Sequence, residues 1–288
     1  MNELKVGFVG LGAMGLPMAG HLAAAGLLAA VWNRSHDKAV AAADALHVAA
    51  PMTVAELAPL CNVIALCVPA DADVLALANE IAGHASPGTI VIDHSTVSSV
   101  TAQAAHATLA VRGCAFLDAP VSGGVEGAKN GKLSVMVGGD EATLEAARTV
   151  LECYAAKVSH MGGVGAGQNT KAVNQVLVAG IAQAVCEGLA LAEKLGLDPD
   201  RLLPTLGAGA ANSWFLEKRG ATMMRDEFKV GFKLALLHKD LKIVRELARD
   251  AGTDRSVIEK SLGDYAVLMA QGHGDEDISA LIRLKRKS

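Results

Sequence analysis

KVGFVGLGAMG, residues Lys5 to Gly15, joins a short β-rich run to a glycine turn and then to an apolar helical segment. In such a unit the first glycine permits the tight turn, the second lets a pyrophosphate approach the backbone, and the third lets helix and strand pack closely. The phosphates then lie at the helix N-terminus. The stretch therefore predicts a dinucleotide site, formed by Gly10, Leu11, Gly12, Ala13, Met14 and Gly15.

Apolar runs and helical stretches alternate through the first half of the chain. We expect strands at residues 5–9, 29–32, 63–68, 89–92, 115–117, 132–137 and 157–160, with helices such as 70–85, 97–111 and 141–154 between them. This alternation predicts an α/β domain, a Rossmann-type doubly wound parallel sheet with helices on both faces. In such a sheet a ligand binds at the carboxyl ends of the strands.

The second expected strand ends in Asn33-Arg34-Ser35, where an NAD site usually carries an acidic residue for the ribose hydroxyls. No carboxylate stands here to repel a 2′-phosphate, and the Arg34 guanidinium can bind one. The three residues therefore favour NADP, with NAD possible. The alternative is an arginine that is simply solvated in a loop.

A glycine-rich segment, Gly162 to Gly167, leads into a long apolar stretch that we expect to be one helix from Gln168 to Leu195. Beyond Gly196 the strand pattern disappears. Asp198-Pro199-Asp200 is expected to cap a short helix, and further helices are expected at 212–219, 232–251, 256–271 and 275–285. The sequence thus predicts two domains, a dinucleotide-binding domain at residues 1–161 and an all-helical domain at 162–288 joined through the long helix.

Three polar residues interrupt the start of the long helix, Lys171, Asn174 and Gln175. Their spacing of i, i+3 and i+4 places an amine and two amides on one helix face. One interpretation is a solvated first turn, and the other is a catalytic group. His94 and Asp93, at a strand end, are interpreted as structural residues.

The composition excludes several classes of protein. The chain has 288 residues, a formal charge of -4 and a pI near 6.1, so nucleic acid is not an expected partner, and the basic segment Arg283 to Lys287 is interpreted as a solvated tail. The five scattered cysteines predict reduced thiols, with no disulfide frame and no metal site. We see no uninterrupted apolar run long enough to span a bilayer, and we expect a cytoplasmic protein.

Taken together, five ordered motifs resemble the β-hydroxyacid dehydrogenase family, which includes 3-hydroxyisobutyrate dehydrogenase, tartronate semialdehyde reductase and the 4-hydroxybutyrate or succinic semialdehyde reductases. The resemblance covers essentially the whole chain. It rests on GFVGLGAMG from Gly7, DHST from Asp93, DAPVSGG from Asp118, GQNTKAVNQ from Gly167 and HKDL from His238.

The resemblance implies a role for each motif. Lys171 matches the general acid/base, with Asn174 and Gln175 beside it, and which of the two amides orients the substrate stays open. Ser122, Gly123 and Gly124 match the loop that binds a substrate carboxylate. The positions that contact or flank the cofactor are matched by Val68, Pro69, Thr96 and Lys239, and Lys239 also matches a residue that lines the substrate cleft.

The family implies an active site between the domains, a homodimer or homotetramer, and a small carboxylated aldehyde or hydroxy acid as substrate. The function so predicted is NAD(P)-dependent interconversion of a β-hydroxy acid and its semialdehyde, of the 3-hydroxyisobutyrate or tartronate semialdehyde class. The alternatives are a 4-hydroxybutyrate or succinic semialdehyde reductase, an imine reductase-like enzyme, or a non-catalytic cofactor-binding module. The last two usually lack the lysine that stands at 171.

Overall fold

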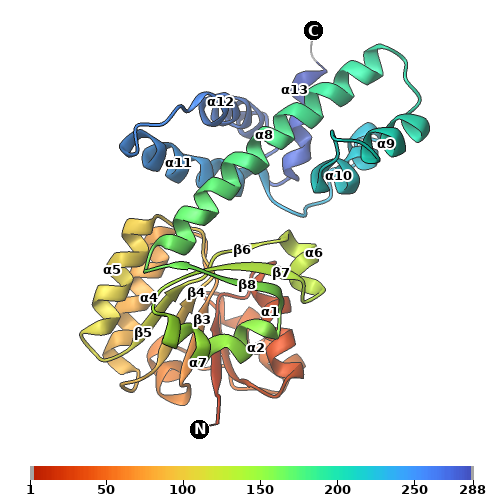
Figure 1. Ribbon diagram of the computed structural model, residues 1–288. Helices are drawn as coiled ribbons and strands as arrows, with labels where there is room; N and C mark the ends of the chain where they lie inside the picture. Colours follow the sequence, from red (N-terminus) through yellow and green to blue (C-terminus); the bar gives the residue numbers. More distant parts are fainter. Residues whose placement is uncertain (1–2, 287–288) are drawn as a thin grey trace. The chain divides into compact units, whose positions relative to one another are not determined.

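The structure is a computed structural model that describes residues 3–286. The chain divides into two compact units, one up to Lys171 and one from Ala172 onwards. The division falls inside helix α8 (Ala166–Lys194), which Figure 1 shows as one continuous helix. The predicted domain boundary at residues 161 and 162 lies instead at the end of the last strand.

The first unit is built on a sheet whose first five strands are parallel. Their order is β2-β1-β3-β4-β5, and they comprise β1 (Val6–Val9), β2 (Leu28–Trp32), β3 (Val63–Leu66), β4 (Ile90–Asp93) and β5 (Ala115–Asp118). A parallel bridge from Ala30 to Ala49 adds one extended residue beyond β2. With Ala49 as the third strand in chain order, the sheet has the 3-2-1-4-5-6 arrangement of a dinucleotide-binding fold.

The remaining strands correct the expectation of a wholly parallel sheet. They are β6 (Val121–Ser122), β7 (Leu133–Gly138) and β8 (Ala155–Gly162), and β7 runs antiparallel to both β5 and β6 but parallel to β8. The chain turns back to β7 through the single short helix α6 (Gly124–Lys129). This connection is shorter than the dozen or so residues that a parallel crossover needs. The predicted fold class itself is confirmed.

Helices cover both faces of the sheet, as Figure 1 shows. They are α1 (Gly15–Ala24), α2 (His36–Leu46), α3 (Val54–Leu57), η1 (Ala58–Leu60), α4 (Asp71–His84), α5 (Ser99–Ala110) and α7 (Glu141–Glu152). One apolar cluster joins Met18 of α1 to Leu144 of α7, and another joins Ile81 of α4 to Leu109 of α5. The sheet is therefore doubly wound, with a separate core on each face.

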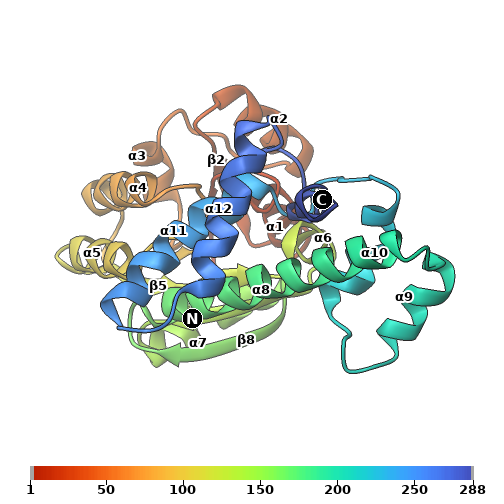
Figure 2. The same cartoon turned by 90° about the horizontal axis from the view of Figure 1, so that it is seen from above.

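The second unit is helical, as predicted. It contains most of α8 together with α9 (Pro199–Gly207), α10 (Trp214–Met224), α11 (Leu234–Asp250), α12 (Ser256–Ala270), η2 (Ile278–Leu281) and α13 (Ile282–Lys285). Its core joins Cys186 of α8 to Leu241 of α11 and Tyr265 of α12. Figure 2 shows α11 and α12 side by side within this unit.

The expected helix at 275–285 is wrong at its first three residues. The Asp277 carboxylate accepts hydrogen bonds from the amides of Gly231, Phe232 and Ser279, at 2.8, 3.0 and 3.1 Å. Because these contacts hold Asp277 in an extended conformation that pairs with Lys233, regular helix begins only afterwards, with η2.

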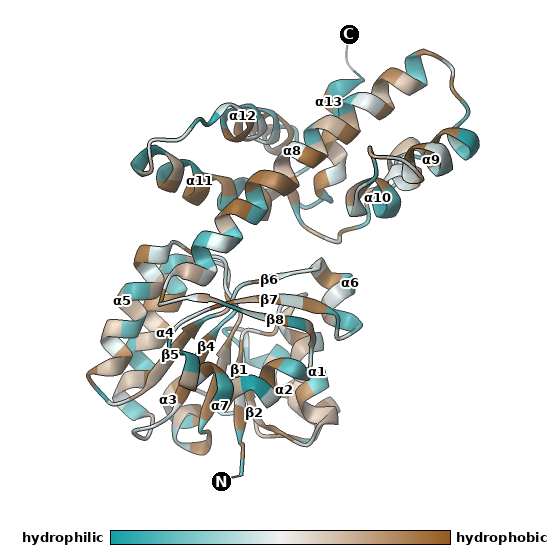
Figure 3. Ribbon diagram, in the orientation of Figure 1, coloured by the Kyte–Doolittle hydropathy of each residue, from teal (hydrophilic) through white to brown (hydrophobic). Residues whose placement is uncertain are grey.

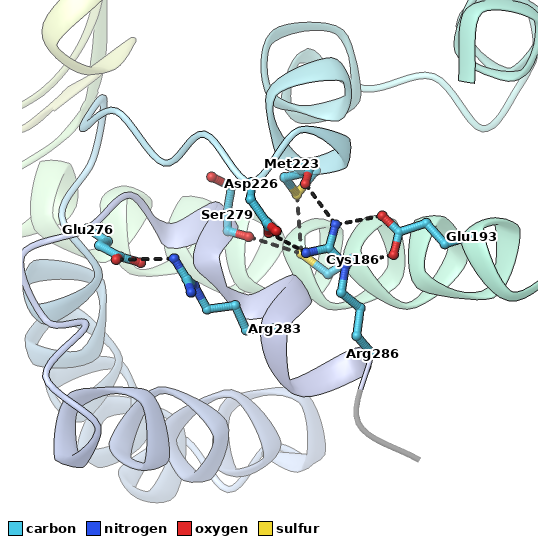
Figure 4. Close-up of polar contacts among 8 residues, drawn as sticks. All are labelled: Cys186, Glu193, Met223, Asp226, Glu276, Ser279, Arg283 and Arg286. Atoms are coloured by element: carbon cyan, nitrogen blue, oxygen red, sulfur yellow. Dashed lines mark hydrogen bonds and ion pairs between the residues drawn. The ribbon is translucent and has the colours of Figure 1, made fainter. Parts of the chain in front are cut away.

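The basic C-terminal segment is anchored, which corrects its interpretation as a solvated tail. Arg286 donates to Glu193 on α8 at 2.6 Å from two of its nitrogens and also pairs with Asp226, as Figure 4 shows. Lys285 pairs with Asp264 on α12 at 3.1 Å. Charge-assisted contacts of this kind tie the end of the chain to α8 and α12. Lys287 lies outside the described residues.

Helix α8 is apolar along most of its length (Figure 3). Its 29 residues make it long and apolar enough to cross a membrane, by length and composition only. Asn174, Gln175, Gln183 and Glu187 interrupt its sequence, so it contains no uninterrupted apolar run of that length. Part of it forms the core of the second unit, while Val173, Leu177, Ile181 and Leu191 are exposed. The predicted homodimer or homotetramer stays a prediction.

His94 is a buried structural residue at the end of β4. Its Nδ1 lies 2.7 Å from the carbonyl oxygen of Ala119 and its Nε2 lies 2.8 Å from the Tyr154 hydroxyl. A carbonyl only accepts, so Nδ1 carries the proton and Nε2 accepts from Tyr154. Burial lowers the pKa of His94 from its ordinary value of 6.5 to about 4. The histidine therefore serves the fold in its neutral form.

This burial predicts a specific acid sensitivity. As the pH falls from 6.5 towards 4, the unfolded chain protonates His94 and the folded chain does not, so the free energy of unfolding falls by at most about 1.4 kcal/mol per pH unit. Chemical denaturation between these pH values should show a shallower pH dependence for His94→Gln than for the wild type. The exposed His84→Gln is the control, and an unchanged slope in His94→Gln would contradict the assignment.

Candidate functional site

The glycine turn between β1 and α1 has the shape that a dinucleotide requires. Gly10 has a φ of 98°, and a Cβ there would lie 2.3 Å from the carbonyl oxygen of Cys67. A Cβ on Gly15 would lie 1.9 Å from the carbonyl oxygen of Gly10, whereas a Cβ on Gly12 would meet no atom within 4 Å. The first and last glycines thus allow close packing, and Gly12 leaves open the backbone that a pyrophosphate would approach. These residues fit the predicted cofactor.

In the turn after β2, the three residues predicted to select the cofactor have different environments. Asn33 braces the glycine turn, because its Oδ1 accepts from the Leu11 amide at 3.0 Å. Arg34 is 83% exposed, and its guanidinium lies 3.6 Å from the Asp73 carboxylate on α4. Ser35 is exposed at the start of α2. Of these three residues only Arg34 carries a positive charge, and it already pairs with Asp73.

The loops after β3 and β4 are tied together. The Val68 amide donates to Ser95 Oγ at 2.9 Å, Pro69 beside it is exposed, and Thr96 is half-buried next to Ser95. Asp71, at the start of α4, accepts from the Ser98 amide at 2.9 Å and the Thr101 hydroxyl at 2.7 Å.

Burial alone would raise the pKa of Asp71, but these hydrogen bonds from Ser98 and Thr101 outweigh it and lower the pKa. Asp71 is therefore ionised at neutral pH and holds the starts of α4 and α5 together. The two loops predicted to flank the cofactor thus form one fixed edge of the sheet.

Lys171 and the predicted carboxylate loop come together in the first unit. The Lys171 side chain is buried, and its Nζ donates to the carbonyl oxygen of Val121 at 2.8 Å. Ser122 follows directly in β6, and Gly123 and Gly124 continue with φ values of 129° and 61°. A cation thus lies one residue from the hydroxyl and glycine amides that could bind an anion.

The amides at the start of the helix that carries Lys171 donate to a buried carboxylate. Asp118, at the end of β5, accepts from the amides of Gly165 at 2.7 Å and Gln168 at 2.9 Å. Burial raises the pKa of Asp118, although these amides favour its charged form. A Cβ on Gly167 would lie 2.4 Å from the carbonyl oxygen of Met136, so only glycine allows the helix this close to the sheet.

Within the second unit, the amides after Lys171 join a buried polar cluster. Gln175 is 1% exposed and donates to Asp240 at 2.7 Å, while its own Oε1 accepts from Asn174 at 2.8 Å. Lys239 on α11 pairs with the other oxygen of Asp240 at 3.0 Å. Asn174 is half-buried, so of the two amides Gln175 is the one committed to the protein interior.

Three polar residues with these roles are absent from the predicted site: Asp118, Gln168 and Asp240. Asp118 stands inside the DAPVSGG motif, Gln168 inside GQNTK and Asp240 inside HKDL. Their positions in these motifs were the sequence feature that could have identified them as site residues. Partners far away in the chain give them their roles, and sequence spacing does not reveal partners. Within residues 3–286 no group of three His, Cys, Asp or Glu side chains could hold a metal ion.

Two family models match the chain. The NAD binding domain of 6-phosphogluconate dehydrogenase matches residues 5–163, and the domain described as NAD-binding of NADP-dependent 3-hydroxyisobutyrate dehydrogenase matches residues 165–285.

Similar proteins cover the full length. A solved structure of Mycobacterium tuberculosis 3-hydroxyisobutyrate dehydrogenase with L-serine is 34% identical, with a TM-score of 0.89 over 99% of this chain and 100% of that one. The NAD-dependent L-serine dehydrogenase of Pseudomonas aeruginosa is 34% identical over 97% of this chain and 97% of its own. The 2-hydroxy-3-oxopropionate reductase of Escherichia coli is also 34% identical, over 97% of this chain and 96% of its own.

These full-length similarities agree with the glycine turn, the sheet order and the helical second unit. The chain belongs to the β-hydroxyacid dehydrogenase family of NAD(P)-dependent oxidoreductases.

Proposed function

We propose that this chain interconverts a small β-hydroxy acid and its semialdehyde, with NADP as the preferred cofactor and Lys171 as general acid/base. The observation that carries the proposal is the contact between Lys171 Nζ and the carbonyl oxygen of Val121, next to Ser122. In this contact a buried amine lies beside the groups suited to a carboxylate. A carboxylate and a reacting oxygen a few bonds apart could then be bound together.

The residues of the first unit have separate tasks in this reaction. When bound, the nicotinamide supplies or accepts the hydride. The Lys171 ammonium stabilises the negative charge that develops on the aldehyde oxygen and donates the proton, and in the other direction its neutral amine accepts the hydroxyl proton. The Ser122 hydroxyl and the amides of Gly123 and Gly124 hold the substrate carboxylate, which fixes the position of the reacting carbon.

The named ligands and activities of the relatives support this substrate class. L-serine, 3-hydroxyisobutyrate and the reduction product of 2-hydroxy-3-oxopropionate are all acids with a hydroxyl on the β-carbon. Their α-substituents differ, so the shared features are the carboxylate and the β-hydroxyl. We therefore assign the class and not one acid.

Lys171 also bears on the alternatives. Imine reduction and a purely cofactor-binding role do not need an amine at this position, and burying one is costly unless it is used or paired. A 4-hydroxybutyrate or succinic semialdehyde reductase keeps the same machinery and differs only in the distance from carboxylate to aldehyde. The number of carbons between carboxylate and aldehyde in the preferred substrate therefore distinguishes a β-hydroxyacid dehydrogenase from a succinic semialdehyde reductase.

Replacement of the lysine tests the proposed chemistry. Lys171→Ala should reduce kcat by about 100-fold or more, the usual contribution of a positioned acid/base, while the Kd for NADPH changes little. Stopped-flow turnover and NADPH fluorescence titration measure the two quantities. Lys157→Ala, at an exposed position of β8, is the matched control. Near-normal turnover by Lys171→Ala would show that another group moves the proton.

The carboxylate site predicts strong discrimination between substrates. A semialdehyde should have a kcat/KM at least 20-fold higher than the same aldehyde without its carboxylate, about 2 kcal/mol, because the groups at Ser122 to Gly124 would be left unpaired. A spectrophotometric panel of three- and four-carbon semialdehydes and simple aldehydes, with NADPH and with NADH, makes this comparison. Equal turnover of simple aldehydes would argue against both the carboxylate site and the β-hydroxy acid assignment.

The preference for NADP rests on Arg34. No carboxylate ends β2, and the guanidinium can bind a 2′-phosphate once it leaves Asp73. Since Arg34 is largely exposed, its pair with Asp73 is weak, and exchanging it for a doubly charged phosphate should be favourable.

Two substitutions test this preference in opposite directions. Arg34→Ala should weaken NADP binding by about 1.5 kcal/mol, the low end for a charged hydrogen bond at an exposed position, and leave NAD binding nearly unchanged. Asp73→Asn should tighten NADP binding severalfold, since it removes the competing charge. Isothermal titration with both cofactors measures the effects. An equal loss for NAD and NADP in Arg34→Ala would rule out a role in selecting the 2′-phosphate.

A further inference from the structure

Gln168 joins the helix of Lys171 to the loop of Thr96. Its Nε2 donates to the carbonyl oxygen of Ser95 at 2.8 Å, and its Oε1 accepts from the amide of Val97 at 3.2 Å. One side-chain amide therefore binds the backbone on both sides of Thr96. Gln168 is 3% exposed, so water does not compete for these two hydrogen bonds.

The same residue is fixed from its other end. Its backbone amide donates to Asp118 at 2.9 Å, and Asp118 also holds the amide of Gly165 at the start of the helix. Lys171 follows Gln168 by three positions, which in a helix places the two on neighbouring turns of the same side. Any shift of Gln168 would therefore move Lys171 with it.

The two side-chain hydrogen bonds of Gln168, to Ser95 and Val97, form a bridge between α8 and the loop after β4. This bridge is connected further to the loop after β3. Ser95, which accepts from Gln168 through its carbonyl, also accepts from the Val68 amide through its hydroxyl at 2.9 Å. The chain of hydrogen bonds thus runs from α8 to the loop after β4 and on to the loop after β3. These are the loops whose Thr96 and Val68 match cofactor-contacting positions.

We propose that Gln168 is a positioning residue that sets Lys171 relative to the loop carrying Thr96, and so sets the proton donor relative to the cofactor-binding edge of the sheet. The inference rests on the proposed function for its catalytic consequence. Gln168 need not touch substrate or cofactor. It acts because a displacement of about 1 Å between reacting groups can reduce a rate by about 100-fold.

A glutamine on the same helix provides the control. Gln183 is half-buried on α8 and its Nε2 also makes two contacts, to Asp264 at 3.0 Å and Ser261 at 3.3 Å, but both partners belong to the second unit. Gln168→Leu and Gln183→Leu thus remove the same amide from the same helix. Only the first breaks the bridge around Thr96.

The experiment compares these variants by hydrogen exchange and by kinetics. In Gln168→Leu the Val97 amide should exchange at least about 10-fold faster, kcat should fall about 10- to 100-fold, and the Kd for NADPH should change less than about 3-fold. The primary isotope effect with deuterated NADPH should rise as the chemical step becomes more limiting. Gln183→Leu should leave all four quantities unchanged. Normal kcat in Gln168→Leu, or equal losses in both variants, would overturn the inference.

A second variant covers the case in which Gln168→Leu does not fold. Gln168→Glu keeps the shape, and its protonated carboxyl can still donate to Ser95 and accept from Val97, whereas the carboxylate cannot donate. Its kcat relative to the wild type should therefore rise as the pH is lowered. A ratio that does not depend on pH would contradict the bridge.

The hydrogen-exchange measurement needs no substrate. The proposed function and the proposed role of Gln168 can therefore be refuted independently of each other. If the wild type reduced none of the semialdehydes, the proposed function would fail, while faster exchange at Val97 in Gln168→Leu would still support the bridge. Normal turnover by Gln168→Leu would remove the positioning role and leave the proposed function intact.

Discussion

The contact on which the first unit depends is the one between the Asp118 carboxylate and the amides of Gly165 and Gln168. A helix begins with amides that have no partner inside the helix, and an acceptor supplied by another element satisfies them. Here the acceptor comes from the end of β5. The start of α8 is thereby fixed to the carboxyl edge of the sheet, which is the edge where such folds bind their ligands.

Burying this carboxylate has a cost, visible in the raised pKa of Asp118. The amide hydrogen bonds offset part of that cost, and small residues are needed around it. Gly138 is confined by Asp118, because a Cβ there would lie 2.4 Å from one of its carboxylate oxygens. Gly167 is confined by the backbone of β7 in the same way. Of the glycines before the lysine, Gly167 is thus explained by packing against the sheet.

The candidate site residues differ in how exposed their side chains are. Lys171, Gln168 and Asp118 are all buried, and each side chain makes short hydrogen bonds to backbone groups of the first unit. Arg34 is instead an exposed charge at the surface, paired with Asp73. In the proposed function, proton transfer, which depends on distance, therefore relies on buried groups, whereas the cofactor preference, which depends on charge, relies on an exposed one.

The fold class and most of the strand and helix positions could be predicted from the amino-acid sequence, because glycine turns and hydrophobic periodicity are local properties. It also singled out Lys171 and Ser122 by their motifs, and the structure brings the two together. The direction of β7, the pairing of Arg34 with Asp73, the anchored Arg286 and the bridge made by Gln168 needed the tertiary structure. Each of these depends on a partner at least 20 positions away, and no local pattern specifies which distant residue will fold against it.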